Sequence, residues 1–238
     1  MARRRSADSD KNKGKIMRIT KSLLWLIRAI LIILTLILIF QRDFLFAFSA
    51  LIATLISFAP VFVERNYNID FPWIIEFLIA FTLLLHILGE FFKLYTLIIF
   101  FSPLMHFFGT ATIALLAFII VYTLNLTKHV KLSPFMIGLF TLIFALAIGT
   151  LWEIGEFASD RFFGTHNQGD GRNPLVDTML DLISDGITGL VVALLGITTN
   201  LIKNKKLIKP FRELVQKIFK KNKKQKPDKI KKAKKRLK

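Results

Sequence analysis

Residues 22–40 read SLLWLIRAILIILTLILIF, and this stretch decides the fold class. Its single charged residue is Arg28. A helix needs about 20 predominantly apolar residues to cross the hydrocarbon core of a bilayer. Five further runs of this kind follow, at 44–63, 71–92, 97–124, 134–157 and 175–201. We therefore predict an all-α, polytopic membrane bundle of six transmembrane helices, in which the long fourth helix is tilted or bends near Pro103.

Composition and charge divide the chain into three parts. Hydrophobic residues make up 53% of the 238 residues, which is more apolar surface than a soluble domain needs. The formal charge of +18 comes from two tails, which hold eight and eighteen of the 34 Lys and Arg residues. We expect a basic N-terminal tail at 1–21, a transmembrane domain at 22–201 and an amphipathic, polybasic C-terminal tail at 202–238. The absence of cysteine excludes disulfides and thiolate chemistry.

The basic tails also predict an orientation. Lys and Arg are enriched on the cytoplasmic side of membrane proteins. Six spans place both tails on one side, so we expect both in the cytoplasm, together with the loops 64–70 and 125–133. The loops 41–43, 93–96 and 158–174 then face outward. The expected protein is a multi-pass protein of the plasma (inner) membrane, oriented N-in/C-in.

Two apolar segments carry acids where a membrane helix normally carries none. Residues 151–160 read LWEIGEFASD, and residues 176–185 read VDTMLDLISD. A charged side chain at the centre of a helix in lipid costs about 2.5–3.5 kcal/mol even on lenient insertion scales. At about 100° per residue, the acids of each segment share one helical face. They are Glu153, Glu156 and Asp160 in the first segment and Asp177, Asp181 and Asp185 in the second.

Two other spans have a polar face at the same end. His86 and Glu90 are four residues apart near the end of the third span, and Ser102, His106 and Thr110 form a stripe near the start of the fourth. The predicted orientation places all these groups in the outer half of the membrane. Such faces must turn inward, because lipid cannot satisfy polar side chains. We predict one polar pocket, open to the outside and bounded by the third to sixth spans.

Three segments resemble the signature blocks of a known family. MHFFG at 105–109, WEIGEFASD at 152–160 and DTMLDLISD at 177–185 are similar to blocks of the YjdF-like inner-membrane proteins, which are distantly grouped with the VanZ-like proteins. The resemblance covers roughly residues 22–201. It implies an inner-membrane protein but no reaction, because the family has no established activity. Phe101-Ser102-Pro103 stands where the family tends to have an acid before the histidine.

The first functional interpretation is a metal-dependent hydrolase or transferase that acts on a lipid or envelope substrate. Carboxylates and imidazole are the usual ligands of divalent metal ions, which activate water for hydrolysis. We assign catalysis to Glu153, Glu156 and Asp181. The predicted metal ligands are His86, Glu90, His106, Asp160, Asp177 and Asp185. The pattern predicts a divalent ion without identifying the metal.

Two further interpretations remain open, so whether the protein is an enzyme is not decided by the sequence. A proton- or cation-coupled transporter also places acids and histidines inside a bundle. The inner half offers only Glu76, and Arg28 is expected to reach the inner surface, so a continuous polar path is missing. A scaffold or sensor without chemistry would pair the acids with Lys93, Arg161 and Arg172. These basic residues are fewer than the acids.

The C-terminal tail has an apolar stripe of its own. Phe211, Leu214, Val215, Ile218 and Phe219 follow helical spacing, which is typical of an amphipathic helix lying on a membrane surface. We expect this helix to bind membrane lipids and anionic lipid headgroups. The predicted lipid-binding residues are Phe211, Arg212, Lys217, Lys220 and Lys221. No specific nucleic-acid partner is expected, and the sequence indicates no protein partner.

Overall fold

The computed structural model describes residues 2–169, 173–198 and 208–218, with side chains from residue 19 onward. The helices are α1 (Ala2–Phe40), α2 (Phe44–Ser57), α3 (Ala59–Tyr67), α4 (Trp73–Phe91), α5 (Leu94–Leu97), α6 (Phe101–Leu126), α7 (Pro134–Phe163) and α8 (Pro174–Thr198). Residues 208–218 form one more helix. The described residues contain no strand.

Six helical segments are long and apolar enough to cross a membrane. They are Ile19–Phe40, Phe44–Tyr67, Trp73–Phe91, Phe101–Leu126, Pro134–Phe163 and Pro174–Thr198. The second of them joins α2 and α3. These segments coincide with the six predicted runs, so the all-α, six-span fold class is confirmed. The N-in/C-in orientation stays a prediction.

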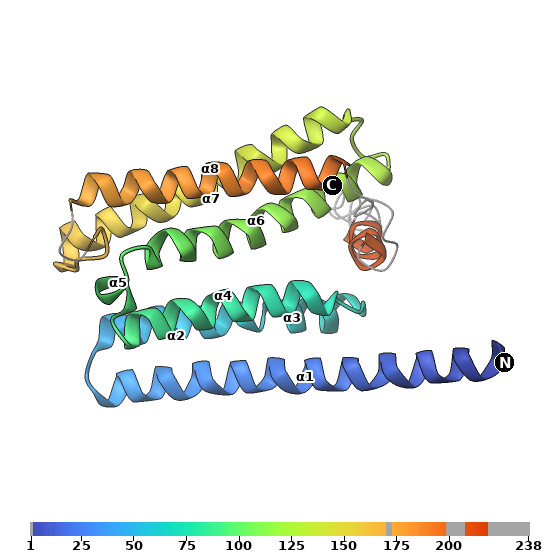
Figure 1. The fold of residues 1–238 in the computed structure, drawn as a ribbon, viewed down its shortest axis with the longest axis horizontal. Helices are drawn as coiled ribbons and strands as arrows, with labels where there is room; N and C mark the ends of the chain where they lie inside the picture. The colour runs from blue at the N-terminus through green and yellow to red at the C-terminus, as the bar shows by residue number, and fades with distance from the viewer. Residues whose placement is uncertain (1, 170–172, 199–207, 219–238) are drawn as a thin grey trace, which may run out of the picture.

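The six spans form two groups of three (Figure 1). Helices α1, α2 and α4 contact one another, helices α6, α7 and α8 do the same, and α4 contacts α6 along the seam. The α1–α2 turn, α5 and the α7–α8 connection lie at one end of the bundle, which we call the α5 end. The helix at 208–218 and the beginning of α1 lie at the opposite end, the tail end.

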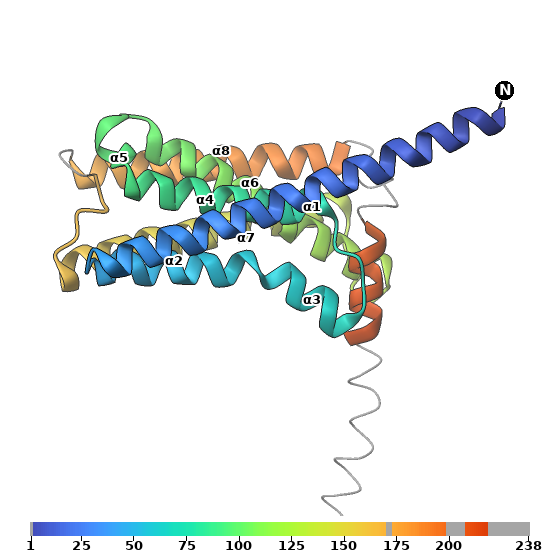
Figure 2. The ribbon, with the colours of Figure 1, turned by 90° about the horizontal axis from the view of Figure 1, so that it is seen from below.

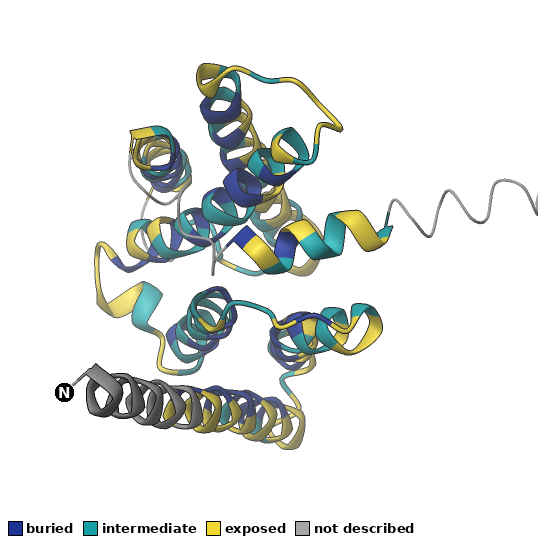
Figure 3. Cartoon of the chain, turned by 90° about the vertical axis from the view of Figure 1, so that its right-hand side faces the viewer, coloured by how far each residue is buried: buried dark blue, intermediate teal, exposed yellow. Residues whose placement is uncertain are grey.

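Small residues bring the helices of each group close together, as is common in membrane proteins. In the first group, Ala47, Ala50 and Ala53 of α2 are buried together with the leucines of α1. In the second group, a Cβ at Gly189 of α8 would lie 3.0 Å from the Cβ of Ala145 on α7. Buried positions face the inside of the bundle and exposed positions face outward (Figure 3). The exposed side is therefore the lipid-facing one.

Arg28 lies inside the first group and does not reach the surface as expected. Its side chain is 3% exposed, and its Nη2 lies 3.2 Å from Oε2 of Glu76 on α4. Nε and Nη2 also donate to the carbonyl oxygen of Ser57, at 3.2 and 3.1 Å. The helix breaks at Phe58, between α2 and α3, so this carbonyl sits at a helix end where an outside donor is needed. The expected snorkelling is thus replaced by an internal ion pair.

The ends of α6 and α8 follow ordinary capping chemistry. Pro103 lies in the first turn of α6, where its missing N–H removes no intrahelical hydrogen bond. The short helix α5 precedes it as a separate element. Asn173 precedes Pro174, and its Oδ1 accepts a hydrogen bond from the backbone N–H of Leu175 at 3.0 Å. This matches the predicted start of the sixth span and places Asp177 in its first turn.

The amphipathic helix of the tail packs on protein. Phe211 is 4% exposed, and its ring meets that of Phe71 edge-on with centroids 5.1 Å apart. Lys217 Nζ donates to the carbonyl oxygens of Tyr67 and Asn68, at the end of α3 (Figure 2). These contacts show that the apolar stripe covers protein at Phe211, and the expected lipid binding stays a prediction. Arg212 is exposed, and Lys220 and Lys221 lie outside the described residues.

Candidate functional site

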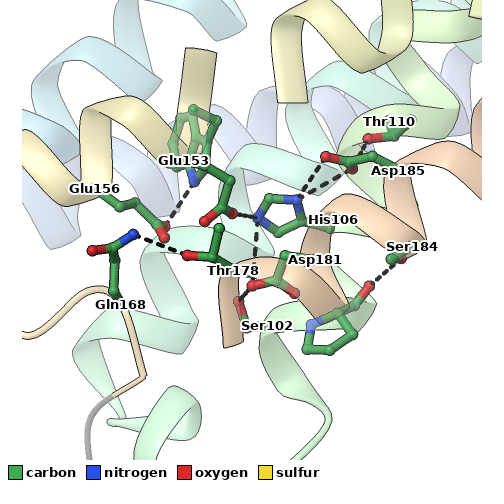
Figure 4. A network of polar contacts seen from close by, with 12 residues as sticks. Ser102, His106, Thr110, Glu153, Glu156, Gln168, Thr178, Asp181, Ser184 and Asp185 are labelled. Carbon is green, nitrogen blue, oxygen red and sulfur yellow. Dashed lines mark hydrogen bonds and ion pairs between the residues drawn. The ribbon is translucent and has the colours of Figure 1, made fainter. Parts of the chain in front are cut away.

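Four of the predicted site residues meet inside the second group of helices, near the α5 end. His106 comes from α6, Glu153 from α7, and Asp181 and Asp185 from α8. All four are buried, with Asp181 and Asp185 at 0% exposure. In Figure 4 the imidazole of His106 lies between Glu153 on one side and Asp185 on the other. The predicted inward turn of the polar faces is therefore seen for α6, α7 and α8, although the cluster is enclosed and not an open pocket.

His106 connects the carboxylates through both ring nitrogens. Its Nδ1 lies 3.2 and 3.1 Å from the two carboxylate oxygens of Asp185. Its Nε2 lies 3.2 Å from Oε1 of Glu153 and 3.9 Å from Oδ2 of Asp181. One side of the ring therefore faces a single carboxylate, and the other side faces two.

Hydroxyl groups of α6 hold the two aspartates. Ser102 donates to Oδ2 of Asp181 at 2.8 Å, and Thr110 donates to Oδ1 of Asp185. Ser102, His106 and Thr110 form the stripe that the sequence indicated. Ser102 belongs to the segment Phe101-Ser102-Pro103 that departs from the expected family pattern, and it contributes a hydroxyl to the same cluster.

Several polar atoms of the cluster are buried without any hydrogen-bond partner. They are Nε2 of His106, both carboxylate oxygens of Glu153, Oδ1 of Asp181 and Oε2 of Glu156. The hydroxyl of Thr178 approaches Glu153, but its geometry falls short of a hydrogen bond. Nε2 of His106 and Oε1 of Glu153 are within ion-pair distance, but their geometry is not that of a hydrogen bond. Among the described residues, no Lys or Arg pairs with Glu153, Glu156, Asp181 or Asp185. Buried carboxylates normally have such partners.

Glu156 lies one turn after Glu153 on α7. Its Oε1 accepts a hydrogen bond from Nε1 of Trp152 at 2.8 Å, while its Oε2 is buried without a partner. The ring of Trp152 meets that of His86 on α4 edge-on, with centroids 5.3 Å apart. Through these contacts the site extends from the second group of helices to the first.

His86 and Glu90 do not join the cluster around His106. Nδ1 of His86 lies 2.7 Å from the hydroxyl of Tyr95 in α5. Burial, and then the nearby carboxylates, raise the pKa of Tyr95 well above its usual value, so its hydroxyl keeps the proton that it can donate. Glu90 lines a separate cavity of about 180 Å³ with Asp43 and Lys93. The structure thus separates these two predicted metal ligands from the others.

The two remaining predicted ligands are placed differently. Asp177 is buried at the start of α8. Asp160 accepts hydrogen bonds from the hydroxyl of Thr165 at 2.5 Å and from the backbone N–H groups of Asn167 and Gln168 at 2.8 and 2.9 Å. Its carboxylate therefore holds the connection after α7, outside the cluster around His106, and its expected role as a metal ligand stays a prediction.

Sequence reasoning missed three contributors to the site. From the sequence, Trp152 is only part of the signature block at 152–160 and Tyr95 has no role, because only their neighbours in the fold give them polar partners. Gln168 donates to the hydroxyl of Thr178 at 2.9 Å, and this contact joins the α7–α8 connection to α8. The helical spacing of Thr178 from Asp181 and Asp185 was the one available signal, and it was too weak to assign a role.

Three residues of the cluster have the arrangement needed to hold a metal ion. One ligand atom from each of His106, Glu153 and Asp181 can be chosen so that all lie within 4.8 Å of one another. Atoms that share one ion at about 2.0–2.2 Å lie up to about 4.4 Å apart, so small side-chain movements suffice. Each of the three residues retains at least one buried atom without a hydrogen-bond partner, and such an atom is available to bind an ion.

Comparisons with known proteins agree with the fold and give no activity. The model of a family described as "Predicted membrane protein (DUF2238)" matches residues 23–201. A Thermotoga maritima protein described as uncharacterized is 31% identical over 132 residues, or 54% of this chain. The match covers 65% of that relative, less than two thirds of its length. No solved structure matches.

The grouping with VanZ-like proteins stays a prediction. The family match contains the segments that carry the resemblance to the YjdF-like proteins, including all four residues of the cluster. Because the match extends over well more than half of the chain, this multi-pass membrane protein belongs to the DUF2238 family of predicted membrane proteins.

Proposed function

We propose that His106, Glu153 and Asp181 bind a divalent metal ion, and that the protein is a metal-dependent hydrolase or transferase acting on a lipid or lipid-linked substrate. The observation that supports this most directly is the convergence of buried ligand atoms without hydrogen-bond partners. Leaving a buried carboxylate unpaired costs several kcal/mol. A bound cation removes that cost.

The donor set indicates the kind of metal. One imidazole nitrogen with two carboxylates suits zinc, manganese or iron better than calcium, which prefers six to eight oxygen ligands. Three protein ligands leave coordination positions for water or substrate, as in catalytic sites. When bound, such an ion would supply Lewis acidity and an activated water.

The residues around the ligands can perform the remaining tasks. Ser102 fixes Oδ2 of Asp181, the oxygen that lies 3.9 Å from Nε2 of His106, and leaves Oδ1 without a hydrogen-bond partner. Glu156 has a buried, unpartnered oxygen one turn from Glu153, and it can accept or donate a proton there. Trp152 orients Glu156 through its other oxygen.

The surroundings favour a substrate from the membrane. The α7 segment that bears Glu153 and Glu156 also has an exposed side, on which Leu151 and Ile154 are 62% and 55% exposed, and Phe157, one turn after Glu153, is 59% exposed. This exposed side is lipid-facing in a membrane protein. A lipid or lipid-linked ester is therefore the kind of substrate that lies next to the segment carrying the acids, in an apolar environment that excludes bulk water.

A transporter of protons or cations is the second candidate. Its support is the ring of His106, which bridges carboxylates from α7 and α8. At the tail end, however, the buried Glu76 is engaged by Arg28 and belongs to the other group of helices. A transported ion would need a polar path past that end, which the described acids do not provide.

Metal content is the first test. Full-length protein is purified in detergent and its bound metals are measured, with melting curves in the presence and absence of chelator. We expect about one metal ion per chain, with loss of the metal in Glu153→Gln and Asp181→Asn. Asp70→Asn is the matched control, because Asp70 is exposed at the tail end. Wild-type protein without metal and without any effect of chelator would overturn the proposed site.

Activity and flux then separate the two candidates. Hydrolysis of lipid esters in mixed micelles should require the metal and be lost in Asp181→Asn. Ion flux in proteoliposomes that is lost in both Glu153→Gln and Asp181→Asn, without hydrolysis, would favour the transporter instead.

The orientation has its own test, since the chain has no native cysteine. Single cysteines at Asn167 and Lys131 are treated with a membrane-impermeant maleimide on intact cells. The proposed N-in/C-in orientation predicts labelling at 167 only.

A further inference from the structure

We infer that Asp185 is a positioning residue and not a metal ligand: it holds the ring of His106 so that Nε2 points to the metal, and Gly149 makes room for it. This inference rests on the proposed metal site. It gives a role to Asp185, which is not among the three proposed ligands. It also gives a role to Gly149, for which the sequence predicted none.

The first observation is the position of Asp185 behind the ring. Its two oxygens lie 3.2 and 3.1 Å from Nδ1, on the side of the imidazole opposite to Glu153 and Asp181. An ionised carboxylate only accepts, so the hydrogen bond requires a proton on Nδ1. In a neutral ring, Nε2 then has no proton and offers its lone pair to a metal. Metal-binding histidines commonly have a carboxylate at the second nitrogen.

The second observation is that Asp185 is itself fixed. It is 0% exposed, and Thr110 donates to one of its oxygens. With Nδ1 of His106 and the hydroxyl of Thr110 as donors, the carboxylate has partners within α6. This distinguishes it from Glu153 and Asp181, which lie on the Nε2 side of the ring and retain oxygens without hydrogen-bond partners.

The third observation is the absence of a side chain at Gly149. A Cβ added there would overlap the carboxylate of Asp185, at 2.7 Å from its Cγ and 3.3 Å from its Cβ. Gly149 lies four residues before Glu153, so the two share a face of α7. This face of α7 therefore carries the proposed ligand Glu153 on one side of His106. On the other side of the ring, Gly149 leaves space for Asp185.

The test uses two ways of removing the contact and one matched control. Asp185→Asn keeps the shape of the side chain and removes its charge. Gly149→Ala changes no polar group and displaces the carboxylate by contact. Gly155→Ala makes the same substitution on the same helix, where an added Cβ meets nothing within 4 Å. The gain in helix propensity is equal in both glycine variants, so it cancels in the comparison.

Two measurements on full-length protein in detergent are informative. Zn²⁺ affinity is determined by competition with a chromophoric chelator, and the imidazole ¹⁵N resonances of His106 are recorded with bound Zn²⁺. We expect Asp185→Asn and Gly149→Ala to bind Zn²⁺ about 10–100-fold more weakly than wild type, while Gly155→Ala is unchanged. In wild type, His106 should show a protonated Nδ1 and a metal-bound Nε2, and the two affected variants should lose this single state.

The outcomes distinguish the two levels of inference. If wild type binds no Zn²⁺, the metal site itself is overturned, and the role of Asp185 falls with it. If wild type, Asp185→Asn and Gly149→Ala all bind Zn²⁺ equally, or if Nδ1 of His106 is the metal-bound nitrogen, only the positioning role is overturned.

Discussion

The substitution Glu153→Gln should change the stability of the protein in opposite directions with and without metal. In the metal-free protein, Glu153 has two buried oxygens without hydrogen-bond partners, and Glu156, Asp181 and Asp185 are close by. Among the described residues, His106 is the one side chain able to carry a positive charge that lies within ion-pair distance of these acids. A single imidazolium can balance one carboxylate, so neutralising Glu153 should relieve repulsion and desolvation.

The magnitude follows from two opposing effects. Replacing buried charges by neutral groups of similar shape is often stabilising by about 1–4 kcal/mol. The new amide lacks partners for its own N–H groups, which costs about 1–3 kcal/mol. We expect a net gain of about 1 kcal/mol in the free energy of unfolding, which corresponds to about 2–4 °C in Tm for a chain of this length.

With excess metal, wild type should instead be more stable than Glu153→Gln. At a free metal concentration of 100 times its Kd, a bound ion stabilises the folded state by about 2.7 kcal/mol. Wild type receives this stabilisation, and Glu153→Gln loses most of it together with the ligand. Wild type should then exceed the variant by about 1.5–2 kcal/mol.

The assay compares melting curves of both proteins in the same detergent and at the same scan rate, with chelator and with excess Zn²⁺ or Mn²⁺. Asp70→Asn should follow wild type in both conditions. A variant that is less stable than wild type by the same amount in chelator and in metal would refute the reasoning, because Glu153 would then stabilise the fold directly.

Three further substitutions test the surroundings of the site. Arg28→Met should lower the free energy of unfolding by about 3–5 kcal/mol, because Glu76 is left charged and buried. In melting experiments, the double variant with Met at both positions should recover most of this stability. Asp160→Asn should cost about 1–3 kcal/mol and expose the α7–α8 connection to protease, without loss of bound metal; loss of the metal would contradict its assignment to the loop. Phe211→Ala should release the helix at 208–218, seen as faster hydrogen exchange there, at a local cost of about 3 kcal/mol; unchanged exchange would show that the ring does not hold this helix.

The spans could be predicted from the sequence because hydrophobicity adds over about 20 residues, so single errors matter little. The boundaries differ where chemistry is local. Helix α7 continues to Phe163, beyond the apolar run, because Gly164 adopts the left-handed conformation that ends it. The break at Phe58 was not predicted, since the carbonyl it leaves is satisfied by Arg28 from another helix.

The site could be predicted only to the level of helical faces. Helical periodicity correctly predicted that His106 and Asp181 face the inside of the bundle, but it cannot predict which helices become neighbours. His86 and Glu90 lie on α4 of the first group, so they have other partners at the same end of the bundle. Asp160 shares a face with Glu153, but it lies two turns further along, where the connection needs an acceptor.

The two groups of helices show different treatments of buried charge. Around Arg28, the carboxylate of Glu76, the carbonyl of Ser57 and the rings of Trp25 and Phe58 surround the guanidinium, so the charge is balanced within the protein. In the first group of helices, the protein therefore pairs its buried charge with a charged partner. Around His106 it places hydroxyl donors on Asp181 and Asp185 and leaves the atoms between them without partners. Of these atoms, Oε1 of Glu153 lies 3.2 Å from Nε2 of His106, and Glu156 and Asp181 contribute one unpartnered oxygen each. This imbalance is the reason for proposing that a cation binds at this site.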